Sequence, residues 1–202
     1  RARDTPEFGV SVAFVVLVVF FSVMNPVFFG IRNLTDILSY VSELGTMTIG
    51  ETFLIISGEF DLSVGSVYAF GGYFAAKLAG GYQPQATGGI PYINLPSLIA
   101  VLITLFLAGG IGYLNSVITI RFRIPSFIAT LGTMWAVRGI MVILTGGANV
   151  TWGGDNIIPT LLAAEIGPYI SPAHLWFIGF TLVFHFVLTR TPYGNWVQAT
   201  GG

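Results

Sequence analysis

Gly58-Glu-Phe-Asp-Leu-Ser-Val-Gly-Ser66 separates two long apolar runs in a chain of which only 8% of the residues are charged. Carboxylates in such surroundings are energetically costly unless they lie at a membrane edge, in a water-filled cavity or against a partner. Glycines near both ends of the stretch allow the backbone to reverse. The stretch therefore predicts a hairpin between two apolar helices, with its two acidic residues in a polar location.

The composition indicates a membrane protein. Hydrophobic residues make up 54% of the 202, and the mean hydropathy is +0.82. A soluble domain of this size could not bury so much apolar surface, and the 26 glycines suit close helix packing in a bilayer. A net charge of −1 gives no indication of nucleic-acid binding. The absence of cysteine excludes disulfides, thiolate metal sites and cysteine nucleophiles.

Six segments are apolar and long enough to be candidates for crossing a bilayer, which takes about 20 residues. They are residues 8–24, 34–57, 65–80, 96–118, 125–145 and 173–189. Glycine and proline mark the breaks between them, and 146–172 is the longest expected loop. The expected fold is an all-α, polytopic membrane bundle of about six spanning helices, in which residues 1–202 form one transmembrane domain.

Loop charges predict the orientation, because Lys and Arg concentrate in short cytoplasmic loops. A cytoplasmic N-terminus places Arg1, Arg3, Arg121, Arg123 and Arg190 inside, and Arg32 and a snorkelling Lys77 near the outer side. The 58–64 turn then lies at the cytoplasmic edge, where its acidic residues need not be buried. Glu59 is there either a solvated loop residue or the ion-pair partner of Arg121 or Arg123.

Within the hairpin, Gly58 and Gly65 are expected to adopt backbone conformations that are closed to other residues. Asp61 and Ser63 are expected to accept hydrogen bonds from free N–H groups at the start of the next helix, as N-caps do. The helix dipole also favours a carboxylate at this end. The alternative role for Asp61 is a gate, or a contact that transmits motion from a partner.

The second span, 34–57, is the most polar of the six. It carries Glu43 and Glu51, which are about 80° apart around a helix, with Met47 between them. A charge at the bilayer centre costs about 2.5–3.5 kcal/mol on insertion scales, so both acids are expected to face the bundle interior. They are candidates for lining a translocation path, together with Arg138, which could also neutralise them. The alternative is a structural role in bonds between helices.

The tetrapeptide Leu-Gly-Thr-Met occurs twice, at 44–47 and 131–134. The two copies lie on spans that run in opposite directions in this orientation, as an inverted-topology repeat would give. Chance recurrence of four common residues is the alternative.

The chain lacks the motifs of common enzyme classes. No glycine-rich phosphate loop ends in Lys-Ser or Lys-Thr, so this chain is not expected to bind ATP. His174 and His185 have no carboxylate or cysteine near them in the sequence, so no metal site is expected. Ser63 and Ser66 lack an adjacent histidine base. We therefore assign no catalytic residue and no cofactor.

Three blocks of the sequence resemble the permease subunits of ribose-type bacterial ABC importers. The 58–66 stretch resembles their signature Gly-Gly-Ile-Asp-Leu-Ser-Val-Gly-Ser. Residues 115–134, Asn-Ser-Val-Ile-Thr-Ile-Arg-Phe-Arg-Ile-Pro-Ser-Phe-Ile-Ala-Thr-Leu-Gly-Thr-Met, are similar to a second block, and 189–202 resembles the approach to the cytoplasmic coupling loop. The resemblance runs from about Asn33 to the last residue. It identifies the 58–66 stretch as a hairpin near the ATPase rather than as a sugar site.

Four residues depart from the family pattern. Glu51, Glu59, Phe60 and Ser116 stand where Met, Gly, Ile and Gly are usual, which leaves the transported sugar open. Family members are also longer, so the chain is expected to be the N-terminal part of a longer permease.

The resemblance implies a permease in the bacterial cytoplasmic membrane, paired with a second permease copy and surrounded by membrane lipid. A cytoplasmic ATP-binding subunit would bind the inner loops, and a periplasmic or lipid-anchored sugar-binding protein would dock on the outer ones. ATP hydrolysis in that subunit would switch the pore between outward and inward access to a monosaccharide or a related small polar solute. The alternatives are a branched-chain amino-acid or nucleoside permease, an ion-coupled secondary transporter and a structural membrane subunit.

Overall fold

The computed structural model describes residues 6–81, 93–162, 164, 166 and 169–202. All regular elements of this part are helices, which confirms the all-α prediction. They are α1 (Pro6–Met24), α2 (Ile31–Ile56), α3 (Val64–Leu78), α4 (Ser97–Phe122), α5 (Ser126–Thr145), α6 (Ile157–Leu162), α7 (Pro172–Arg190) and α8 (Pro192–Gly201). Six of these lie where the six spans are expected, whereas α6 and α8 are additional.

The six expected spans differ in length and polarity. Among the helices of the described residues, only α4, α5 and α7 are both long and apolar enough to cross a membrane, and the apolar part of α1 is shorter. The 26-residue α2 is more polar, and α3 has 15 residues, or about 22 Å at 1.5 Å per residue. Because the hydrocarbon core is about 30 Å thick, the non-helical chain before α3 has to supply part of that crossing.

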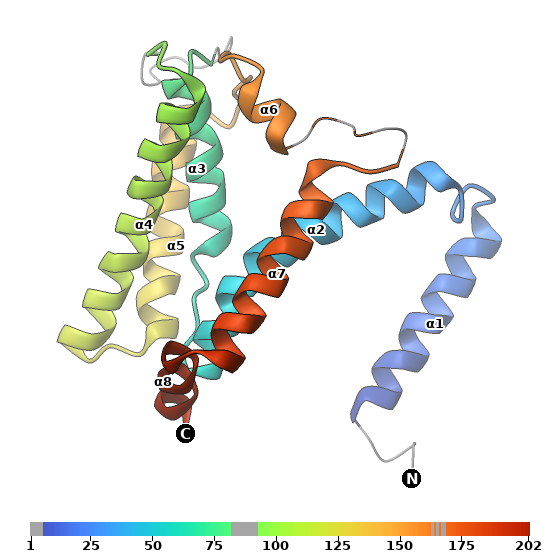
Figure 1. Ribbon diagram of the computed structural model, residues 1–202, viewed down its shortest axis with the longest axis horizontal. Coiled ribbons are helices and arrows are strands. Elements are labelled where there is room, and N and C mark those ends of the chain that lie inside the picture. Colours follow the sequence, from blue (N-terminus) through green and yellow to red (C-terminus); the bar gives the residue numbers. More distant parts are fainter. Residues whose placement is uncertain (1–5, 82–92, 163, 165, 167–168) are drawn as a thin grey trace.

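The long helices alternate in direction, as the predicted topology requires (Figure 1). The start of α1, the C-terminus, the α2–α3 connection, the α4–α5 loop and α8 lie at one end of the molecule. We call this end the inner end, after the orientation predicted from the loop charges.

The helices pack in two groups. One consists of α3, α4 and α5, and the other of α2 with α7 and α8. The short α6 contacts both α4 and α7, and therefore bridges the groups at the outer end (Figure 1). The buried cluster of Tyr73, Val137 and Met141 joins α3 to α5.

The two Leu-Gly-Thr-Met copies make different contacts. Gly45 on α2 lies against the ring of Phe177 on α7, and a side chain on Gly45 would overlap that ring. A Cβ on Gly132, its counterpart on α5, would meet no described atom within 4 Å. The inverted repeat therefore stays a hypothesis.

The loop after α5 docks on α4 at the outer end. Asp155 accepts hydrogen bonds from the N–H of Ile157 at 3.1 Å and, more weakly, from the N–H of Ser97 at 3.5 Å, while Trp152 Nε1 donates to the Asp155 carbonyl at 3.0 Å. The pKa of Asp155 is lowered, chiefly by the neighbouring Ser97 side chain and also by the N–H groups of Ile157 and Ser97. Together these groups outweigh desolvation, which raises the pKa.

Candidate functional site

The chain leaves α2 through a Schellman turn. Gly58 has a φ of 82°, in the left-handed region that favours glycine. Its N–H bonds to the Ile55 carbonyl at 3.0 Å, and the Glu59 N–H bonds to the Leu54 carbonyl at 2.9 Å, which is the bond pair of this motif. The prediction for Gly58 is confirmed. The prediction for Gly65 is wrong, because this residue lies inside α3 with a helical backbone.

The non-helical segment before α3 is bound to one face of α5. The Phe60 N–H donates to Ser126 Oγ, and the Leu62 N–H donates to Thr130 Oγ1, both at 3.1 Å. Two residues of extended chain advance by about 6.6 Å and four residues of helix by about 6.0 Å. The spacing of the two N–H donors therefore matches the spacing of the two hydroxyl acceptors. Non-helical backbone at membrane depth is tolerated where protein groups satisfy it in this way.

A chain of side-chain bonds links the same segment to α4 and α5. The hydroxyl and the N–H of Ser63 both donate to Asp61 Oδ1, at 2.6 and 2.7 Å. The Ser63 hydroxyl accepts from Asn115 Nδ2 at 3.0 Å, and Asn115 Oδ1 accepts from Thr133 Oγ1 at 2.6 Å. The capping prediction is therefore corrected. Asp61 binds the residue before the helix, and the Ser63 side chain makes no capping bond.

The last turn of α8 packs on the end of α2. A Cβ on Gly201 would overlap the carbonyl of Ile56, and the Cα of Gly201 lies 3.8 Å from the position of a Cβ on Gly58. Such a close approach of two backbones requires glycine. The three sequence blocks that carry the family resemblance thus meet at the inner end of the molecule.

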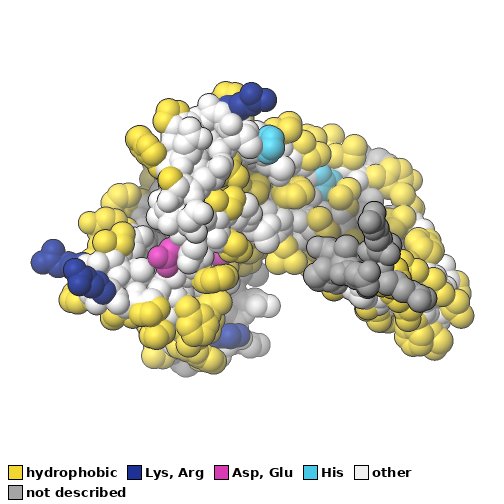
Figure 2. Space-filling model, turned by 90° about the horizontal axis from the view of Figure 1, so that it is seen from below, with side chains coloured by type: hydrophobic (Ala, Val, Ile, Leu, Met, Phe, Trp, Pro, Cys, Tyr) yellow, Lys and Arg dark blue, Asp and Glu magenta, His cyan; other side chains and the backbone are white. Residues whose placement is uncertain are grey.

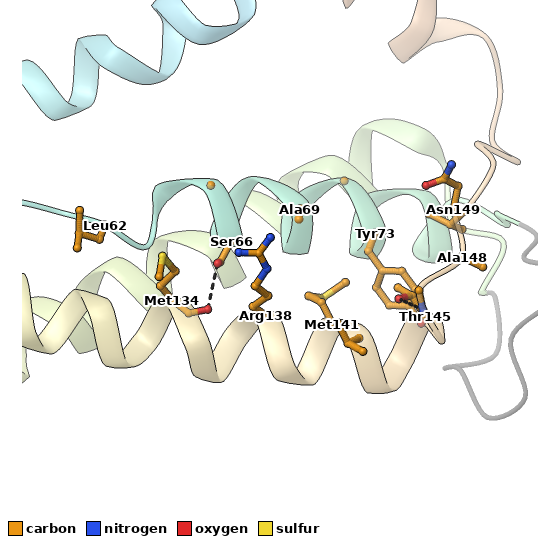
Figure 3. Close-up of a pocket in the computed structure, with 15 residues that line it drawn as sticks. Leu62, Ser66, Ala69, Tyr73, Met134, Arg138, Met141, Thr145, Ala148 and Asn149 are labelled. Carbon is orange, nitrogen blue, oxygen red and sulfur yellow. Dashed lines mark hydrogen bonds between the residues drawn. The ribbon is translucent and has the colours of Figure 1, made fainter.

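A groove of about 1090 Å³ runs between α3 and α5 and continues to the loop after α5 (Figure 3). On α3 it is lined by the small residues Gly65, Ser66, Ala69 and Gly72, and by Tyr73. Ser66 Oγ donates to the Met134 carbonyl at 3.0 Å and ties the two walls together. Since small-molecule sites measure roughly 300–1,000 Å³, the groove has room for a small solute.

Arg138 is the charged side chain of this groove. It projects from α5 toward α3 (Figure 3), and none of the other described residues that line the groove is charged. Its guanidinium carbon lies 5.8 Å from the centre of the Trp135 ring, within range of a cation–π interaction. Tyr73 is 3% exposed, and its hydroxyl has no hydrogen-bond partner among the described residues. The groove therefore offers the Arg138 guanidinium to an oxygen-rich solute.

The other predicted path residues lie elsewhere. Glu43, Met47 and Glu51 are on α2, which packs against α7 and α8, and none of the three lines the groove. Glu43 is exposed instead of facing the interior of this bundle, and Glu51 is half-buried near Asp61. In the described part of the chain, neither acid forms an ion pair with Arg138. Their place in a translocation path stays a prediction.

Arg121, Arg123 and Arg190 are exposed at the inner end. Figure 2 shows this end from below, with basic side chains at its edge and acidic ones closer to the middle. Across the residues with described side chains, no ion pair joins Glu59 to either neighbouring arginine. Lys77, expected to snorkel, is instead buried in the last turn of α3.

His174 has a structural position. Its Nδ1 accepts from the Ser171 N–H at 3.1 Å, and its Nε2 lies 3.2 Å from Ser39 Oγ, so the ring joins α7 to α2. The described residues contain no group of three His, Cys, Asp or Glu that could hold a metal ion.

Several residues of the site were missed in the sequence. Ser126 and Thr130 are four residues apart, the spacing of one helix face, and Asn115 is a buried amide in an apolar helix. That spacing and that isolated amide were the available signals. The 58–66 stretch is predicted from the sequence to be a hairpin, with a gate or coupling contact as the alternative role of Asp61, and not to be a sugar site; its Gly65 and Ser66 nevertheless line the groove.

Apolar helices of alternating direction, with a polar groove between two of them, define a multi-pass helical membrane protein. Residues 33–202 match the family described as branched-chain amino acid transport system / permease component, and the chain belongs to this family.

Relatives of known name agree with this assignment. The chain is 33% identical to the ribose import permease protein RbsC of Escherichia coli over 193 residues, which cover 95% of this chain and 56% of that protein. It is 29% identical to the xylose/arabinose import permease protein XylH of Sulfolobus acidocaldarius over 195 residues, 96% of this chain and 52% of that protein. The chain thus spans a little over half the length of these relatives. No solved structure matches.

Proposed function

We propose that the chain forms part of the permease subunit of an ATP-binding cassette importer that moves a monosaccharide across the cytoplasmic membrane. The groove between α3 and α5 is the solute path on this proposal. The observation that carries it is a groove of about 1090 Å³ with a glycine and alanine wall on one side and Arg138 on the other. The names of the relatives, which are import permeases for ribose and for xylose/arabinose, support a sugar.

The proposed partners follow from the two ends of the molecule. At the inner end, α8, the α2–α3 segment and the α4–α5 loop lie together, and a cytoplasmic ATP-binding subunit would bind there. ATP hydrolysis belongs to that subunit. A sugar-binding protein would dock at the outer end, and a second permease copy would complete the pore. Binding and hydrolysis of ATP would then shift the population between outward-open and inward-open states.

Filling the groove tests this proposal. Gly72→Leu places a large side chain in the groove, where a Cβ would meet no described atom within 4 Å, so the helix packing is preserved. Gly110→Leu is the matched control, because Gly110 on α4 is equally open but does not line the groove. Uptake of radiolabelled D-ribose and L-arabinose is measured in proteoliposomes that hold the permease, its ATPase and its binding protein.

Gly72→Leu should reduce uptake at least about tenfold, which corresponds to about 1.4 kcal/mol, at an unchanged amount of assembled complex. Gly110→Leu should retain it. Equal uptake by both variants would place the path elsewhere, with the α2 acids as the next candidates. Uptake that continues without the ATPase would favour an ion-coupled transporter.

A further inference from the structure

The groove between α3 and α5 carries one uncompensated charge. Arg138 lies twelve residues after the first residue of α5, Ser126, about 18 Å along the helix at 1.5 Å per residue. The last residue of α5, Thr145, is seven residues further on, about 10 Å away. None of the described lining residues is acidic, and neither Glu43 nor Glu51 pairs with Arg138 in the described part. The guanidinium therefore gives the groove a positive potential.

The surroundings of Arg138 strengthen and hold this charge. Met134 and Met141, about one turn away on either side along α5, are apolar lining residues. Arg138 itself is exposed, and its charge acts over a longer distance than in bulk water on the side where these apolar walls exclude solvent. Contact with the Trp135 ring at 5.8 Å limits the guanidinium to one side of the helix. In Figure 3 it reaches across the groove toward Ser66 and Ala69 on α3.

A second polar group lies further along the same groove. Tyr73 is 3% exposed and lines the groove, and its hydroxyl has no partner in the described structure. A buried hydroxyl without a partner costs free energy, but this oxygen is itself buried and not open to solute in the groove. Arg138 therefore supplies the donor group of this groove, and its fork of N–H groups matches neighbouring oxygen atoms of a polyhydroxy solute.

We propose that Arg138 makes this groove a charge-selective solute site, which admits neutral or anionic polyhydroxy solutes and rejects those with an ammonium group. The guanidinium donates parallel N–H bonds to adjacent hydroxyl or carboxylate oxygens. An amino sugar, or the ammonium of an amino acid, finds no carboxylate in the described lining and is repelled. This inference rests on the proposed function, because it assumes that the groove admits solute.

These 202 residues contain no cysteine, so a single introduced thiol gives a direct test once any cysteine elsewhere in the permease is replaced by serine. Ala69→Cys puts one thiol on the groove wall near Arg138 (Figure 3). The permease is assembled with its ATPase in proteoliposomes. Labelling rates are measured with an anionic reagent, 2-sulfonatoethyl methanethiosulfonate, and a cationic one, 2-(trimethylammonium)ethyl methanethiosulfonate. Each rate is divided by that of free 2-mercaptoethanol with the same reagent, which removes intrinsic differences in reactivity.

The normalised ratio of anionic to cationic rates should exceed one. It should fall at least about tenfold in the Arg138→Gln background, because one charge changes the two rates in opposite directions. Arg138→Lys should keep the ratio, since it keeps the charge and changes the shape. A merely structural role for Arg138 would move both rates together and would not be rescued by lysine.

Two results would overturn the charge-selective site, and they differ in whether they also refute the proposed solute path. Equal normalised rates in all three backgrounds, with rapid labelling, would show a watery groove whose arginine is neutralised by an unseen partner, and the proposed path would survive. No labelling by either reagent in any nucleotide state would show a dry groove. That result would remove both the charge-selective site and the proposed path.

Discussion

The bonds between Thr130 and the segment before α3 give the most direct test of how the site is built. Thr130 is 3% exposed, and its hydroxyl accepts the Leu62 N–H at 3.1 Å. Its own proton is donated to the Ser126 carbonyl at 2.8 Å. Thr130→Val keeps the shape and removes the hydroxyl. The Leu62 N–H then has no protein acceptor.

The expected cost follows from that orphaned donor. A buried backbone N–H left without a partner costs about 1–3 kcal/mol. For a chain of this size each kcal/mol lowers the melting temperature by roughly 2–4 °C. Thermal unfolding of the permease in detergent, followed by size-exclusion chromatography with tryptophan fluorescence, measures the shift. Thr130→Ser keeps the acceptor and should retain most of the stability.

Thr104 provides the matched control. It is 5% exposed on α4, and its hydroxyl donates at 2.8 Å to the Ala100 carbonyl of its own helix. Thr104→Val removes that bond without leaving any backbone N–H unpaired, so its effect should stay within about 0.5 kcal/mol. If Thr130→Val and Thr104→Val lowered the melting temperature equally, the assigned role of Thr130 would be refuted.

Two further predictions concern the ends of the molecule. Gly201→Ala should detach α8 from α2, because the new Cβ overlaps the Ile56 carbonyl. Gly179→Ala is the control: this position on α7 is open, so the change should be neutral or stabilising by up to about 1 kcal/mol. Limited proteolysis between α7 and α8 distinguishes the two variants, and equal cleavage would contradict the packing of α8 on α2. The lowered pKa of Asp155 means that its stabilising effect on the outer loop is present above about pH 4 and is lost as the pH falls through the folded-state value. The protection factors of the amides in residues 151–157, which are exchange rates corrected for the intrinsic pH dependence, should therefore fall in acid. Asp155→Asn should remove this dependence, and an unchanged acid response in the variant would assign it to another group.

The positions of the spans could be predicted because they depend on local properties. Apolar runs, prolines and glycines determine where helices start and stop in a bilayer. Pro172 and Pro192 occupy the first positions of α7 and α8, and Gly58 ends α2 as expected. The α6 helix of six residues was missed, since so short a segment has too little periodicity to stand out in a polar loop.

The side of α2 that faces the bundle could not be predicted in this way. Glu43 and Glu51 suggested a path because charges in an apolar span are rare and often functional. In the structure α2 instead packs on α7, where Gly45 admits the Phe177 ring. Helix rotation depends on which partner offers the complementary surface, and that partner is 132 residues away along the chain, from 45 to 177.

The sequence by itself determined an all-α membrane protein, the order and direction of its spans, and the three blocks that carry the family resemblance. Only the tertiary structure decided that these blocks meet at the inner end. There Ser126 and Thr130 satisfy the non-helical backbone before α3, and Gly201 lies against Ile56. Only the tertiary structure also separated Arg138, in the groove, from the acids on α2. The physical reason is that hydrophobic periodicity is local, whereas hydrogen-bond satisfaction and close backbone contact depend on residues distant in the chain.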